Sequence, residues 1–81
     1  MQKLTPEKYI EYIIKNLVNH PEEVKINRID GTKETIVEIR VHQEDIGKVI
    51  GKNGSVVRAL RTIVNAVGNR ERKNYILEVI D

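Results

Sequence analysis

Two glycines set three positions apart interrupt an apolar stretch in the second half of the chain. Gly51 and Gly54 bracket Lys52 and Asn53, and aliphatic residues with helical spacing lie on both sides. Glycine adopts positive φ angles without the steric cost that a Cβ imposes, so this segment predicts a tight turn between two helices. The missing Cβ also lets the backbone of another molecule approach closely.

The same loop is suited to contact a phosphate. The amides of Lys52, Asn53 and Gly54, with those that open the next helix, are expected to face one anion, and the lysine adds positive charge. Spacing excludes two nucleotide-binding motifs. A Walker-type loop has four residues between its glycines, whereas Gly47 and Gly51 are separated by three, and the three glycines do not fit Gly-x-Gly-x-x-Gly.

Apolar periodicity predicts a helix and then a hairpin in the first half of the chain. Thr5 and Pro6 are typical of a helix start, and apolar residues recur at helical spacing up to Val18. Apolar and charged residues alternate from Val24 onwards, as in half-buried strands, with Asp30-Gly31 as the turn. The second strand is predicted to end near His42.

The second half predicts two helices and a last strand. Residues 46–50 indicate a short helix, and Ser55 is a candidate N-cap for a longer one that ends at Gly68 in a left-handed conformation. Residues 69–73 are expected to form a basic loop, and alternation from Tyr75 onwards predicts a strand. The fold class is therefore α+β in the order αββααβ, with helices on one face of a three-stranded sheet.

Composition restricts the chemistry that the chain can perform. The absence of cysteine excludes disulfides, thiolate metal sites and a cysteine nucleophile. His20 and His42 are interpreted as separate surface histidines, and no nucleophile and base are grouped. Met1 to Pro6 lack the apolar run of a secretory signal, and no window approaches a membrane span. We therefore predict a cytoplasmic non-enzyme without catalytic residues, metal, cofactor, small-molecule substrate or membrane contact.

Charge is distributed unevenly along the 81 residues. Residues 46–73 contain seven basic side chains and one acidic side chain, a net charge of +6, whereas the remainder contains seven basic and eleven acidic side chains, a net charge of −4. Such a chain can present a positive face to a polyanion while its total charge stays at +2. A solvated charged surface is the alternative interpretation.

The stretch from Ile46 to Leu60, taken with the αββααβ order, closely resembles the KH signature over the whole chain. The order is similar to the type II KH fold, and the length resembles the small bacterial single-KH family called KhpA. The resemblance implies one KH domain over residues 1–81 and single-stranded RNA as the partner. It also implies a role as an RNA chaperone or post-transcriptional regulator linked to cell growth and division.

The resemblance also implies which residues contact RNA. The loop would clamp the backbone of about four nucleotides. The predicted contact residues are Gly51, Lys52, Asn53, Gly54, Ile46, Gly47, Lys48, Ile50, Val57, Arg58 and Arg61. Val37, Ile39 and Val41 would form the other wall of the groove. Core packing remains the alternative for Ile46, Ile50 and Val57. Arg58, Arg61, Thr62 and Asn65 share one polar arc of about 100° on the helix. Residues 70–73 are interpreted as a solvated loop.

The helix after the loop has an apolar arc of roughly 180°, wider than one buried face requires. The excess consists of Val56, Ala59, Ile63 and Ala66. Either the first helix covers it or a partner does. The resemblance favours a homodimer centred on Ile63, or a heterodimer with a larger KH-containing protein. Two functions therefore remain open, an RNA-binding module and a protein adaptor on a KH scaffold.

Overall fold

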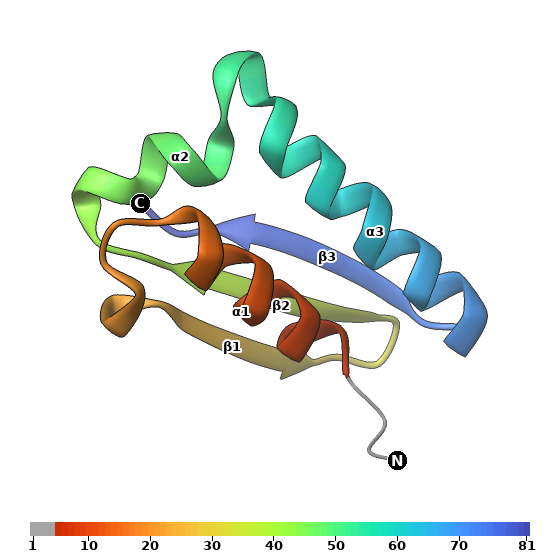
Figure 1. The fold of residues 1–81 in the computed structure, drawn as a ribbon. Coiled ribbons are helices and arrows are strands. Elements are labelled where there is room, and N and C mark those ends of the chain that lie inside the picture. The colour runs from red at the N-terminus through yellow and green to blue at the C-terminus, as the bar shows by residue number, and fades with distance from the viewer. Residues whose placement is uncertain (1–4) are drawn as a thin grey trace.

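The computed structural model describes residues 5–81; residues 1–4, on which part of the prediction about a secretory signal rested, lie outside this range. Figure 1 shows the elements in the predicted αββααβ order. They are α1 (Pro6–Leu17), β1 (Lys25–Asp30), β2 (Glu34–Arg40), α2 (Ile46–Ile50), α3 (Ser55–Glu71) and β3 (Asn74–Val79), with 3-10 turns at Pro21–Glu23, Gln43–Asp45 and Lys52–Gly54.

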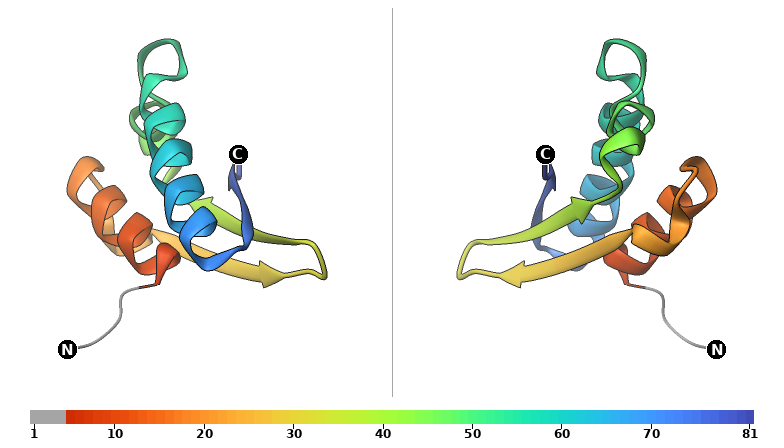
Figure 2. Two further views of the ribbon diagram at one scale, coloured as in Figure 1. Left: turned by 90° about the vertical axis from the view of Figure 1, so that its right-hand side faces the viewer. Right: turned by 90° about the vertical axis from the view of Figure 1, so that its left-hand side faces the viewer.

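The three strands form one mixed sheet in the order β1-β2-β3. β1 and β2 form the predicted antiparallel hairpin, in which Asp30 pairs with Thr35. β3 then runs parallel to β2, with Thr35 opposite Tyr75. All three helices lie on the same side of this sheet, as the two side views in Figure 2 show. The predicted α+β fold, with helices on one face of a three-stranded sheet, is therefore confirmed.

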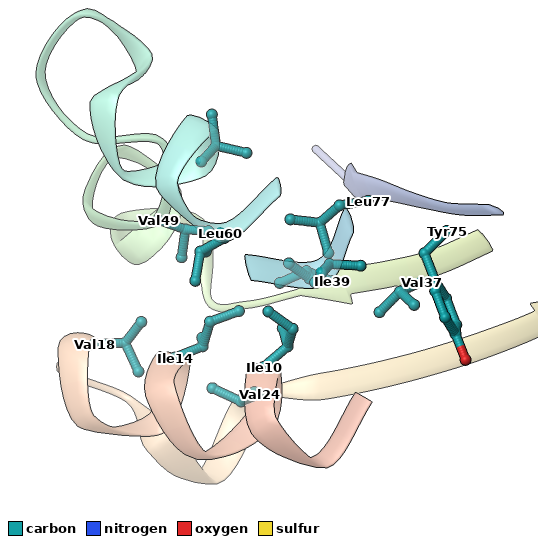
Figure 3. Close-up of a cluster of buried hydrophobic side chains, with 12 residues drawn as sticks. Ile10, Ile14, Val18, Val24, Val37, Ile39, Val49, Leu60, Tyr75 and Leu77 are labelled. Atoms are coloured by element: carbon teal, nitrogen blue, oxygen red, sulfur yellow. The ribbon is translucent and has the colours of Figure 1, made fainter. Parts of the chain in front are cut away.

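The core lies between the helices and the sheet. Alternate residues of β2 point toward the helices, and aliphatic side chains from α1, α2 and α3 meet them (Figure 3). Val37 and Ile39 are fully buried in this layer, so the prediction that these two line a groove wall is wrong. Val41, the third predicted wall residue, is partly buried and lines a hollow together with Ile46 of α2. The alternation had identified a buried face correctly, but at Val37 and Ile39 that face packs against the helices.

The C-terminal end of α3 differs from the prediction. The helix continues through Gly68 to Glu71, and Arg72 takes the left-handed conformation with φ 58°. Gly68 is required for space, because a Cβ there would lie 2.6 Å from the Lys73 carbonyl oxygen and 2.8 Å from Cδ2 of Tyr75. The glycine therefore lets β3 turn back tightly against the helix.

Two predicted helix caps also differ in detail. Ser55 is the first residue of α3, and the N-cap is Gly54, with φ 74°. Thr5 does occupy the N-cap position of α1, but its side chain makes no capping hydrogen bond.

Among the helices of residues 5–81, none has the length and apolarity needed to cross a membrane.

Candidate functional site

The glycine loop stands at the junction of α2 and α3, on the side of the molecule away from the sheet (Figure 1). Its backbone uses positive φ at three positions, with 78° at Gly51, 56° at Asn53 and 74° at Gly54. At Gly51 the ψ angle is 172°, a combination that only glycine adopts readily. The chain can therefore make this turn only with glycine at its first position.

Hydrogen bonding inside the loop decides which amides are free. The Gly51 amide donates to the Gly47 carbonyl oxygen at 2.8 Å, and the Gly54 amide donates to that of Gly51 at 3.1 Å. Gly54 therefore cannot offer its amide freely to a phosphate, as the sequence had suggested. In the described part of the chain, the amides of Lys52 and Asn53 donate to no carbonyl oxygen outside their own turn. Both residues are exposed.

Side chains from both helices surround the loop. Nη1 of Arg58 donates to the Asn53 carbonyl oxygen at 2.7 Å, so this arginine braces the loop as well as carrying charge. Nζ of Lys48 donates to Oδ1 of Asn19 at 3.2 Å. Ile50 is 38% exposed beside the loop, whereas Val57 is only 8% exposed and belongs to the core. For Val57 the structure favours the core-packing interpretation.

Asp45, whose structural role the sequence did not indicate, anchors the start of α2. Its side chain is fully buried and accepts the amide of Asn19 at 3.1 Å and the amide of His20 at 2.9 Å. Burial opposes ionisation, but these two amide donors, together with the charges of nearby His20 and His42, outweigh it and hold the pKa of Asp45 below its ordinary value. The carboxylate therefore joins the end of α1 to the short helix that precedes the loop.

Replacing Asp45 with asparagine should lower the thermal midpoint at neutral pH by several degrees. Because the pKa of Asp45 is lower in the folded than in the unfolded chain, its contribution is present above the ordinary pKa and is lost as the pH falls through the folded value. The variant should therefore lose less stability than the parent between neutral pH and pH ~3. Thermal unfolding at each pH measures this difference, with Glu78→Gln as the control. If the thermal midpoints of Asp45→Asn and of the parent changed with pH in parallel, the Asp45 carboxylate would not have this stabilising role.

α3 presents three different surfaces along its length. Val57, Leu60 and Val64 face the core. One flank carries Arg58, Arg61, Thr62 and Asn65, all exposed as predicted. The other flank carries the four predicted interface residues, of which Ala59, Ile63 and Ala66 are exposed and Val56 is partly buried. α1 does not cover this flank, since Ile63 is 42% exposed. Cationic and apolar surfaces thus lie on opposite sides of one helix.

Comparison with known proteins agrees with this geometry. The family model for the KhpA/KhpB KH domain matches residues 7–79. The chain belongs to this KhpA/KhpB family. It is 46% identical over 72 residues to the RNA-binding protein KhpA of Borreliella burgdorferi, covering 89% of this chain and 88% of the relative.

Other KhpA relatives give the same result. The RNA-binding protein KhpA of Clostridium perfringens is 44% identical over 71 residues, covering 88% of this chain and 95% of the relative. The RNA-binding protein KhpA of Aquifex aeolicus is 40% identical over 72 residues, covering 89% of this chain and 91% of the relative. No solved structure matches the chain significantly. KhpA is not an enzyme family, which confirms the prediction that the chain is not an enzyme.

This KhpA-family chain brings its two histidines together, so their interpretation as separate surface residues is wrong. The rings of His20 and His42 stack with centroids 4.0 Å apart, and Glu23 lies within reach of both. Nδ1 of His42 accepts the amide of Glu44 at 3.0 Å. The neutral ring therefore carries its proton on Nε2, which faces Glu23 at 3.7 Å. His20, Glu23 and His42 each place one possible ligand atom within 4.8 Å of the other two, so this group could hold a metal ion if the proton of His42 moved to Nδ1.

Proposed function

We propose that this KH domain binds single-stranded RNA in the cytoplasm through its glycine loop. The observation that carries the proposal is that Lys52 and Asn53 are exposed residues at the junction of two helices, and that their amides donate to no carbonyl oxygen outside their own turn. Amides that have no partner in the fold, next to a lysine, are suited to a phosphate oxygen. The relatives named RNA-binding protein KhpA support RNA as the polyanion.

The loop would clamp the backbone of about four nucleotides. Lys52 would supply charge, while Gly51 and Gly54 would keep the backbone open to close approach. Arg58, Arg61 and Lys48 would add longer-range attraction, and Ile46, Gly47 and Ile50 would contact the bases or sugars. Because the loop has no aromatic neighbour on which a base could stack, we expect modest affinity and little sequence preference. A role as an RNA chaperone or post-transcriptional regulator of growth and division would be compatible with such binding.

Changing both Lys52 and Asn53 to aspartate should weaken RNA binding by roughly 100-fold, because like charges at contact distance repel by ~1 kcal/mol each even in water and one attraction of similar size is lost. Both glycines remain, so the turn should still form. Fluorescence anisotropy with a short oligouridine measures the affinity. In the parent, contact with two or three phosphates predicts a slope of log affinity against log salt of about −1.4 to −2.1.

The chain itself offers a matched control. Lys15 and Asn16 form the same dipeptide on α1, where both are exposed, and changing both to aspartate alters the net charge equally. This control should bind RNA nearly as well as the parent. Equal weakening by the two double variants would mean that total charge, and no particular loop, attracts RNA. Full affinity in the Lys52 and Asn53 variant would exclude the clamp.

A second proposal is that the chain also pairs with itself through α3. It rests on the exposed flank of Ile63, Ala59 and Ala66, with Val56 at its edge. An isoleucine on the surface between two small residues leaves room for a second helix to approach closely. A larger KH-containing protein that presents a similar helix would fit the same flank. Pairing would also place two glycine loops on one assembly and raise avidity for an RNA that reaches both.

A further inference from the structure

A second cationic surface lies at the end of α3 that is remote from the glycine loop. A hollow there is lined by residues of the β1–β2 hairpin and of the turn between α3 and β3, among them Lys33, Arg72 and Lys73. Figure 1 shows the hairpin tip and the C-terminal end of α3 on the same side of the molecule. The loop contact proposed above does not involve these residues.

The charge on this hollow is not neutralised within the fold. Arg28 at its base is paired, because its Nε donates to Oδ1 of Asp30 at 2.9 Å and its Nη1 contacts Glu7 at 3.2 Å. By contrast Lys33, Arg72 and Lys73 form no ion pair within residues 5–81. Glu34 also lines the hollow. Three unpaired cations against one unpaired carboxylate leave an excess positive charge facing solvent.

Arg72 has a backbone conformation that arginine does not favour. It ends α3 with φ 58° and ψ 38°, in the left-handed region where glycine is the preferred residue. The turn holds it there, since its amide donates to the Asn69 carbonyl oxygen at 3.3 Å and that of Lys73 donates to Gly68 at 2.8 Å. An unfavourable residue at such a position suggests that its side chain has a role outside the fold.

A polar stripe on α3 connects the loop to this hollow. Arg58, Arg61, Asn65 and Asn69 recur at intervals of three or four residues and are all exposed. They therefore lie on one side of the helix. Arg72 follows the last helical residue, Glu71, and lines the hollow. At 1.5 Å per residue, the distance from Gly54 to Arg72 along the axis is about 27 Å. An RNA strand that leaves the loop along this stripe passes arginine, asparagine and threonine side chains before it reaches the hollow.

We propose that Arg72, Lys73 and Lys33 bind backbone phosphates of the same single-stranded RNA that the glycine loop holds. This inference rests on the proposed function, and it extends the bound length beyond the four nucleotides of the loop. The competing explanation is that Arg72 and Lys73 merely complement the dipole at the helix end. That explanation accounts for their charge, but it does not require an arginine at the left-handed position, where glycine would stabilise the turn better.

The test changes Arg72 to glycine and Lys73 to glutamine together. A control removes two positive charges outside the hollow, through Lys8→Gln and Arg70→Gln, both at exposed positions. Anisotropy titrations over a range of salt use oligouridines of 5 and 15 nucleotides. For the hollow variant, the affinity for the longer strand should fall roughly 10- to 30-fold at 0.1 M salt, and the salt slope should flatten by about 1.4, as two lost phosphate contacts predict. The 5-mer should bind as in the parent.

The thermal midpoint provides a second readout, because glycine suits the left-handed turn. The Arg72→Gly change should leave the midpoint unchanged or raise it, so that weaker binding cannot be attributed to unfolding. Unchanged affinity for the 15-mer, or an equal loss in the control, would overturn the second contact while leaving the loop contact intact. Failure of the proposed function itself would give a different result. The double change of Lys52 and Asn53 to aspartate would then leave the affinity for both the 5-mer and the 15-mer unchanged.

Discussion

Replacing Gly51 with alanine is expected to destabilise the protein by about 2 to 6 kcal/mol, from backbone strain of ~1 to 3 kcal/mol and steric overlap of similar size. The strain arises because φ is 78° and ψ is 172° at this position. The overlap arises because the new Cβ would lie 2.4 Å from Cγ2 and 2.8 Å from the amide nitrogen of Val56. In a domain of this size the thermal midpoint should fall by more than ~10 °C.

Gly47 provides the matched control for this change. It lies one turn earlier, inside α2, and a Cβ there would meet nothing within 4 Å. Alanine is a better helix former than glycine, so Gly47→Ala should stabilise the protein by about 0.5 to 1 kcal/mol. Chemical denaturation of both variants compares them directly. If Gly51→Ala proved as stable as Gly47→Ala, the turn would have another conformation available, and the loop would not be held open for a phosphate.

Local sequence signals predicted the fold and the loop well. Helical and alternating periodicities identified every helix and strand, because each depends on neighbours in the chain. The role of Gly68 was predicted wrongly, since the tight approach of Tyr75 depends on where β3 returns. Asp45 and the amide of Asn19 are 26 positions apart, and only the packed fold brings them together. Likewise, His20 and His42 stack because the residues after α1 lie beside those after β2.

Within the candidate site too, features that depend on neighbours in the chain were predicted, and features that depend on the packed fold were not. The spacing of Gly51 and Gly54 predicted the turn, but not that the Gly54 amide is already occupied by the Gly51 carbonyl oxygen. Aliphatic residues near the loop could equally belong to a groove or to the core. Burial distinguishes them, since Ile50 is exposed and Val57 is not. A hydrophobic pattern identifies the residues that avoid water, whereas the packing decides what covers them.

Replacing Ile63 with aspartate should raise the dissociation constant of the homodimer by at least about 100-fold. In a symmetric pair the change occurs twice, so two carboxylates would lose water at the centre of the interface, and truncating central residues of this kind typically costs ~2 kcal/mol or more each. The monomer itself should keep its fold, because Ile63 is half-exposed and lies outside the core cluster. Light scattering at tens of micromolar protein measures the mass of parent and variant.

Asn65→Asp is the control, because it introduces a carboxylate on the same helix but on the polar flank. That variant should remain dimeric. A parent protein that stays monomeric at these concentrations would exclude the homodimer, and a dimer that survives Ile63→Asp would place the interface elsewhere. If the pairing holds, the dimer joins two loops, so separating them should weaken binding to a long RNA more than to a short one. If Ile63→Asp weakened binding to the long RNA more than binding to the short one, pairing through the apolar flank of α3 would support the RNA contact that the glycine loop makes.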